Sequence, residues 1–278
     1  MVISIASAVK SATLEKARAI FVRGTDCLGP EEVMNVHGKL HRLKLPKKLP
    51  DLPWSMEELQ AAHARDESAH LILVPPGLMM QAIYEKRKNL GRDGGKLLYD
   101  IDWYKAETFF TTATTGEDWD WRLVTNKVIP NSTSPNYVEQ TATIADYLTN
   151  VVFAGRDLLP VYRQAVDEFK GKEQTLTKLI NDDWQEAAKQ LSMLALNRLL
   201  RGTPAFTFYD WVTYLEVNGE RLLESSYHWT SALSSPGSLL NLGGFARVGA
   251  SAGGCRPRSR CDGLGVVLSR SALVESEK

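Results

Sequence analysis

The residues best suited to chemistry gather near the C-terminal end of the chain, where residues 242–272 hold five arginines against one aspartate. Arg256, Arg258 and Arg260 alternate with Pro and Ser. In an extended backbone alternate side chains emerge on one face, and a row of planar guanidinium groups suits a carboxylate or a phosphate. The segment therefore predicts a recognition face for an acidic protein or an anionic small ligand. A solvated loop that only keeps the protein soluble is the alternative.

Two cysteines, Cys255 and Cys261, lie in the same segment. Neighbouring arginines would lower the pKa of a thiol, so redox-active thiols are one interpretation, and small residues tolerated in a loop are the other. As zinc ligands they would need two partners, and no Cys-x-x-Cys or paired His stands nearby. His37 and His41 have the spacing of a helical metal pair but lack the adjacent Glu of a metalloprotease helix. We therefore expect no metal site and no cofactor.

The sequence carries none of the common catalytic motifs. It has no P-loop, no Gly-x-Gly-x-x-Gly after a strand and no Gly-x-Ser-x-Gly elbow. Paired acids occur at Asp118 and Asp120 and at Asp182 and Asp183, where a turn and a helix surface explain them better than an acid–base pair does. We therefore predict no catalytic residue and favour a binding protein over an enzyme.

Charge and composition exclude several classes of protein. The 33 Lys and Arg residues balance 33 Asp and Glu residues, whereas a protein built wholly for nucleic acid needs a basic surplus. No aromatic residue follows Phe245 to stack on bases, so nucleic acid is not an expected partner. The chain has no apolar run of about 20 residues and no leader in which a basic region precedes an apolar one. We expect no membrane span and a cytoplasmic location.

The N-terminal third must be built mainly from helices. Apolar residues recur at helical spacing in residues 9–22, and residues 55–58 form a capping box that begins another helix. Between them, residues 29–54 carry four prolines and a basic run, which predicts a linker or an extended arm. A short strand is predicted over residues 70–74. Because residues 91–95 hold three glycines and no apolar residue, we predict a helical N-terminal region of residues 1–95 with a proline-rich basic arm.

The remainder of the chain mixes helices and strands. A strand is predicted over residues 121–124, and helices are predicted from Pro135, over residues 158–169 and over residues 176–200. The alternating aromatic pattern of residues 206–214 and the Asn218-Gly219 pair predict a strand and a hairpin. Two further strands are predicted over residues 239–245 and 264–268. The predicted fold class is α+β, with a mixed domain over residues 96–278.

Two groups of motifs resemble a known family. They comprise residues 119–124, 128–134 and 139–140 in the first group and residues 227–231, 243–247 and 263–270 in the second. Together they resemble an uncharacterised family of bacterial proteins from uncultured, small-genome lineages. The C-terminal part is similar to the C-type-lectin-like fold of formylglycine-generating-enzyme-type domains, with Gly265-Val266-Val267-Leu268 in the place of the closing strand.

The resemblance covers about residues 97–272 and implies both a fold and a mode of binding. Relatives of that fold include the variable target proteins of diversity-generating retroelements, in which a randomised loop before the last strand binds ligands. The corresponding loop is residues 247–262, and the implied recognition residues are Arg247, Arg256, Arg258, Arg260 and Asp262. Trp229 and Phe245 are expected to anchor the core beneath that loop. The alternative is a formylglycine-generating-type oxidase that uses Cys255 and Cys261.

Overall fold

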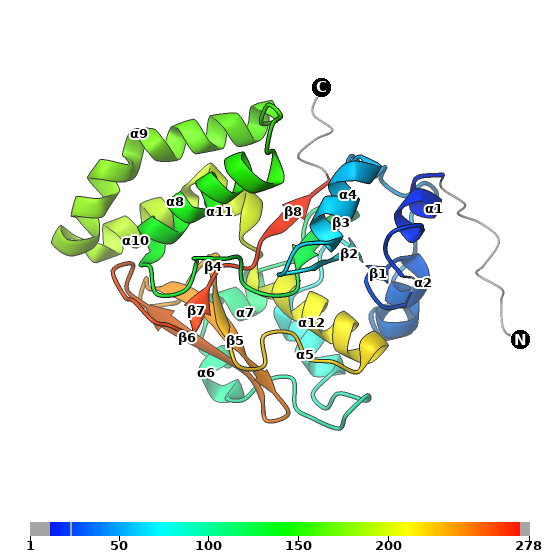
Figure 1. Cartoon of the computed structure of the whole chain (residues 1–278). Coiled ribbons are helices and arrows are strands. Elements are labelled where there is room, and N and C mark those ends of the chain that lie inside the picture. The colour runs from blue at the N-terminus through cyan, green and yellow to red at the C-terminus, as the bar shows by residue number, and fades with distance from the viewer. Residues whose placement is uncertain (1–11, 23, 273–278) are drawn as a thin grey trace, which may run out of the picture.

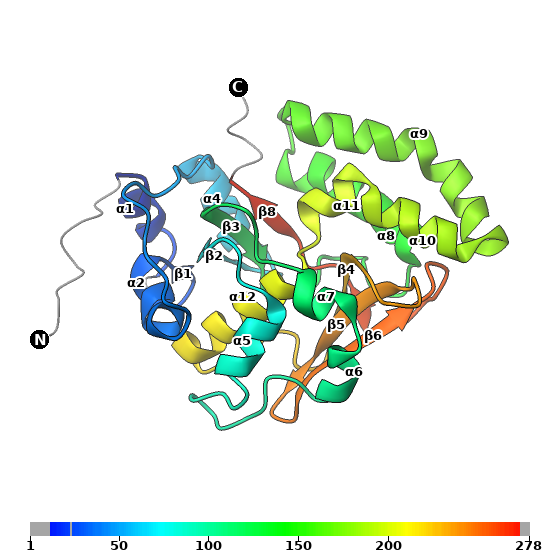
Figure 2. The ribbon, with the colours of Figure 1, turned by 180° about the vertical axis from the view of Figure 1, so that it is seen from behind.

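The computed structural model describes residues 12–22 and 24–272. These residues form two four-stranded sheets and a larger number of helices, which confirms the α+β class. Helices α8 to α11 lie together at one end of the molecule, and α1 and α2 lie at the other end (Figures 1 and 2). The two sheets lie between these groups of helices.

The first sheet has the strand order β1-β2-β3-β8, and its only parallel pair among the described strands is β1 with β2. Its strands are β1 (Cys27–Leu28), β2 (Ala69–Val74), β3 (Asp120–Thr125) and β8 (Ser269–Ser271). The strands predicted over residues 70–74 and 121–124 are present as β2 and β3. Because strands from both sides of residue 95 share this sheet, the predicted boundary at residue 95 does not separate two folding units, and the region before it is not purely helical.

The second sheet has the strand order β6-β5-β4-β7, in which β4, β5 and β6 are antiparallel and β7 runs parallel to β4. Its strands are β4 (Tyr227–Leu233), β5 (Leu239–Ala246), β6 (Gly249–Cys255) and β7 (Leu264–Gly265). The sequence predicts a single loop over residues 247–262. The structure differs, because β6 occupies the first half of this segment. Small residues fill this strand, and its backbone pairs with β5 from Leu239 opposite Cys255 to Gly243 opposite Ser251.

The next helices pack around the first sheet and along the second, and α12 is the most deeply buried of them. They are α1 (Ala12–Arg18), α2 (Pro30–Val33), the π-helix η2 (Met34–Gly38), α3 (Lys39–His41), α4 (Met56–His63), α5 (Met80–Lys86), α6 (Ile101–Lys105), α7 (Thr108–Thr112) and α12 (Pro204–Asn218). The predicted extended arm is helical over its first part, from α2 to α3, because Pro30 stands at the first helical position, which proline favours. The predicted capping box begins α4: the Glu58 N–H donates to the Ser55 hydroxyl, and the Ser55 N–H donates to the Glu58 carboxylate.

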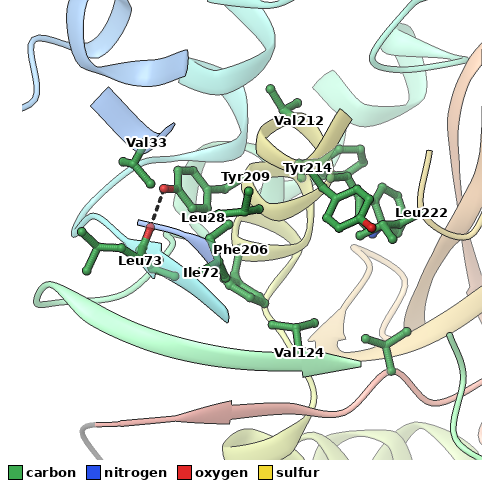
Figure 3. Close-up of a cluster of buried hydrophobic side chains, with 14 of the residues drawn as sticks. Leu28, Val33, Ile72, Leu73, Val124, Phe206, Tyr209, Val212, Tyr214 and Leu222 are labelled. Atoms are coloured by element: carbon green, nitrogen blue, oxygen red, sulfur yellow. Dashed lines mark hydrogen bonds between the residues drawn. The ribbon is translucent and has the colours of Figure 1, made fainter. Parts of the chain in front are cut away.

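The strand and hairpin predicted over residues 206–222 are instead the helix α12. Thr203 caps its N-terminus, and Gly219 ends it with a left-handed φ of 77°. The sequence pattern was misleading because nearly every face of this helix is buried, so no polar stripe marks a helical period. Figure 3 shows side chains of α12, among them Phe206, Tyr209 and Val212, packed with residues of the first sheet. The Tyr209 hydroxyl donates to the Leu73 carbonyl of β2 at 2.6 Å.

The second group of helices covers one side of the second sheet. It consists of α8 (Tyr137–Tyr147), the π-helix η3 (Leu148–Val152), α9 (Pro160–Asp182), α10 (Trp184–Met193) and α11 (Ala195–Leu200). The helix predicted from Pro135 is present as α8, but those predicted over residues 158–169 and 176–200 are divided differently. The chain runs continuously helical through α9 and breaks at Asp183, whose carboxylate accepts from the Glu186 N–H at 3.1 Å and so begins α10.

The two predicted core anchors are both buried but belong to different hydrophobic clusters. Phe245 packs in the cluster around the first sheet and α12, where its ring stacks on Trp211. Trp229 packs in the cluster formed with α8 to α11, against Tyr137. The second sheet therefore joins the two cores.

Candidate functional site

The five predicted recognition residues do not form one surface, because strand β6 separates them into two groups. Arg247 lies in the turn between β5 and β6, where its guanidinium donates to the Asp93 carbonyl at 2.8 Å. Arg256, Arg258 and Arg260 lie beyond the other end of β6. Arg247 therefore does not belong to the same recognition face as the other three arginines. The candidate site is the segment Arg256–Asp262, called the basic turn below.

The backbone of the basic turn is folded rather than extended. The Ser259 N–H donates to the Arg256 carbonyl at 2.9 Å, which closes a tight turn. Pro257 is buried, and its carbonyl accepts from the Tyr137 N–H at the start of α8. The alternating arginines consequently do not form the predicted one-sided row, because a proline at the second position favours a turn over a strand.

The three arginine side chains of the basic turn are exposed but have different neighbours. The Arg256 guanidinium lies 5.1 Å from the centroid of the half-buried Trp184 ring, a cation–π arrangement. Arg260 forms an ion pair with Glu139. Arg258 is exposed at the tip of the turn. Two guanidinium groups, those of Arg256 and Arg258, are therefore placed to meet an anion.

The end of the basic turn is fixed to the segment before α8. The Ser134 hydroxyl donates to the Asp262 carboxylate at 2.6 Å, and the Ser134 N–H donates to the Cys261 carbonyl. The Glu139 side chain is fixed by a capping box at the start of α8, in which the Asn136 N–H donates to the Glu139 carboxylate at 3.0 Å. Asp262 thus positions the backbone of the turn. The sequence could not identify Trp184 or Glu139 as part of this site, because both stand far away in the chain and no spacing rule connects them to the turn.

Cys255, the last residue of β6, does not have the environment of an activated thiol. Burial raises the pKa of the Cys255 thiol, and the nearby Cys261 acts in the same direction. The Asn241 side-chain amide donates to the Cys255 sulfur at 3.3 Å. Cys261 is exposed, and both cysteines are free. A reactive thiol needs a lowered pKa, so the geometry gives the oxidase alternative no support at Cys255.

Asp120 of the paired acids, and the histidine pair, make contacts that join elements of the fold. Asp120 forms an ion pair with Arg122, with 2.8 Å between the carboxylate oxygen and the guanidinium nitrogen, and it accepts from the Ala272 N–H at 3.0 Å, which fastens β3 to the end of β8. The rings of His37 and His41 lie 5.5 Å apart, and His37 shares a 2.9 Å hydrogen bond with the Thr213 hydroxyl of α12. Within the part of the chain that the structure describes, no three His, Cys, Asp or Glu side chains converge as metal ligands.

A second polar cluster is buried between β2 and α12. The His70 ring donates through Nε2 to the Asp210 carboxylate and through Nδ1 to the Asn126 side-chain oxygen, both at 2.6 Å. Burial alone would lower the pKa of His70, but the Asp210 charge and the two hydrogen bonds outweigh it and raise that pKa. Both ring nitrogens of His70 thus face acceptor oxygens, which favours the imidazolium form, and the His70–Asp210 pair links the first sheet to α12. The strand that the sequence predicts over residues 206–214 gives no reason to connect Asp210 with His70, and only the helix α12 brings the two together.

Among the residues that the structure describes, no helix is both long and apolar enough to cross a membrane. In comparisons with models of protein families, with curated proteins and with solved structures, nothing matches this chain. The function of this chain is therefore inferred from the chemistry of the site itself.

Proposed function

We propose that this chain is a non-enzymatic binding protein whose basic turn captures a carboxylate-bearing or otherwise anionic ligand. The observation that carries the proposal is the pair of exposed guanidinium groups, Arg256 and Arg258, on a turn whose backbone is already fixed. Arg256 is further held over the Trp184 ring. A preorganised guanidinium loses less conformational entropy on binding than a mobile one, which favours affinity.

The same proposal includes the C-type-lectin-like fold for the segment from β4 to β7. The antiparallel arrangement of β4, β5 and β6 supports it, as does the position of the basic turn directly before β7, the last strand of the second sheet. In the resembling variable proteins the loop before the last strand is the part that binds ligands. The recognition face is smaller than residues 247–262, because only Arg256–Asp262 remains a turn.

The test is a double substitution that removes both unpaired arginines and spares Arg260, whose ion pair with Glu139 supports the turn. Arg256→Ser with Arg258→Ser is compared with wild type by calorimetric titration of a hexaglutamate peptide and of citrate. Losing two charge-assisted contacts of about 1.5–3 kcal/mol each should weaken binding by at least a hundredfold. The melting temperature should not change, because both side chains are exposed.

The matched control is Arg163→Ser with Arg198→Ser, which removes two exposed arginines from α9 and α11. It has the same net charge as the test variant, so it should retain wild-type affinity if binding is local to the basic turn. Equal losses in the test and control variants would contradict the proposal, because they would show that net charge alone drives binding. Failure of wild type to bind either anion would also contradict it.

A further inference from the structure

A groove of about 570 Å³ lies between the segment that follows α4 and the helices α8 and η3. It shares no residue with the basic turn. From the α4 side come Arg65, Asp66 and Glu67, and from the α8 and η3 side come the side chains that include Asp146 and Tyr147. The volume falls in the range of small-molecule sites, about 300–1,000 Å³.

Two of the residues that line this groove each carry a buried polar atom without a hydrogen-bond partner among the described residues. Glu67 is only 5% exposed, and its Oε1 accepts no hydrogen bond from any residue that the structure describes. Tyr147 is 7% exposed, and within the described ranges its hydroxyl has no partner either. A buried carboxylate oxygen without a donor is costly. A ligand with N–H groups would supply the missing donor.

The one guanidinium of the groove lining is already engaged by other groups. Arg65 lies 5.9 Å from the centroid of the Tyr147 ring and donates to the Val151 carbonyl at 3.4 Å. Burial lowers the pKa of Arg65, and the Glu67 charge opposes that effect. Arg65 is thus held against the wall formed by α8 and η3 and leaves the Glu67 oxygen without a hydrogen bond.

The charge of the lining selects a cation. Three carboxylates, those of Asp66, Glu67 and Asp146, stand against the single Arg65 guanidinium. Asp66 and Asp146 are exposed, which places them at the mouth, whereas Glu67 is buried. Since the described part of the chain holds no converging set of three ligating side chains, the lining does not suit a metal ion. It suits a cation that spreads its N–H donors over several acceptors.

We infer that this groove binds a small organic cation that carries at least two N–H donors, an ammonium or a guanidinium group. Glu67 is its deep acceptor, and the Asp66 and Asp146 carboxylates attract it at the mouth. The inference is independent of the basic turn, which takes ligands of the opposite charge.

Calorimetric titration of the full chain with agmatine, which has a guanidinium at one end and an ammonium at the other, tests the inference. Saturable one-to-one binding is expected for wild type. Glu67→Gln should weaken that binding by tenfold or more, because a charge-assisted hydrogen bond is lost. Glu117→Gln, which neutralises an exposed acid outside the groove, should bind as wild type does. The melting temperature of Glu67→Gln without ligand should equal or exceed that of wild type, because an unpaired buried charge is removed.

Asp146→Asn provides a second variant that does not depend on a buried position. It should weaken agmatine binding several-fold and leave the fold intact, since Asp146 is exposed. Absence of saturable agmatine binding to wild type would overturn the inference. Wild-type affinity for agmatine in both Glu67→Gln and Asp146→Asn would overturn it as well. Competition between magnesium chloride and agmatine that Glu67→Gln abolishes would also overturn it, because that result would identify a metal site.

Discussion

Replacing Asp210 by Asn tests whether the buried His70–Asp210 pair is a charged link between β2 and α12. In the folded protein both side chains are almost completely buried, and their nitrogen and oxygen atoms lie 2.6 Å apart. Asn preserves the shape of Asp and removes its charge. The variant therefore leaves His70 buried without the carboxylate that stabilises its imidazolium form.

The expected cost follows from burial. Removing one partner of a buried ion pair costs about 3–5 kcal/mol, and the lower value applies here because Asn can still accept a hydrogen bond. For a chain of this size about 3 kcal/mol corresponds to a fall of roughly 6–12 °C in the melting temperature. The loss should appear in urea unfolding as a lower midpoint with an unchanged slope.

The pH dependence gives the sharper test of the same variant. Because the pKa of His70 is raised in the folded state, its contribution to stability is complete below the unfolded value of about 6.5 and is lost as the pH rises through the raised pKa. In Asp210→Asn burial lowers the pKa of His70, so the variant should gain stability as the pH rises through about 6.5. The difference between the two proteins should be largest in acid and shrink toward alkaline pH. A difference that stays constant across that range would refute the assignment of His70 as an imidazolium.

Two further predictions concern the backbone and the thiols. Gly249→Ala should lower the free energy of unfolding, measured with urea, by about 3 kcal/mol, because Gly249 has a φ of 107° and an added Cβ would overlap the Leu98 backbone. Gly171→Ala, in α9 with open space around it, should instead raise that free energy by about 0.5–1 kcal/mol. Equal effects of the two substitutions would contradict this reasoning. In a thiol titration of the native protein the exposed Cys261 should react first. Cys27 should react only after unfolding, because burial raises its pKa to about 12. Rapid labelling of Cys27 in the native protein would contradict its burial.

Local signals in the sequence predicted the elements whose causes are local. The capping box at Ser55 and Glu58, the apolar strand β2 and the helix α8, which begins just after Pro135, were all recognisable from neighbouring residues. These features depend on hydrogen bonds or packing within a few positions, so a single sequence contains the information needed for them.

Features decided by distant contacts could not be predicted in this way. The aromatic residues from Phe206 to Tyr214 alternate like a strand, yet they form a helix because both the first sheet and neighbouring helices bury α12 on nearly all sides. Glycine-rich β6 forms because β5 stands beside it. Likewise, the partners of Arg256 and Arg260, namely Trp184 and Glu139, are brought together only by the tertiary fold.

Hydrogen exchange of the full chain, measured with and without hexaglutamate, shows whether the basic turn is the recognition face. Added peptide should slow exchange in Arg256–Asp262 and at the start of α10 beside Trp184. This protection should fade with rising salt, because the contacts are exposed charges. Protection centred on Arg247 or elsewhere, with none in the basic turn, would contradict the account.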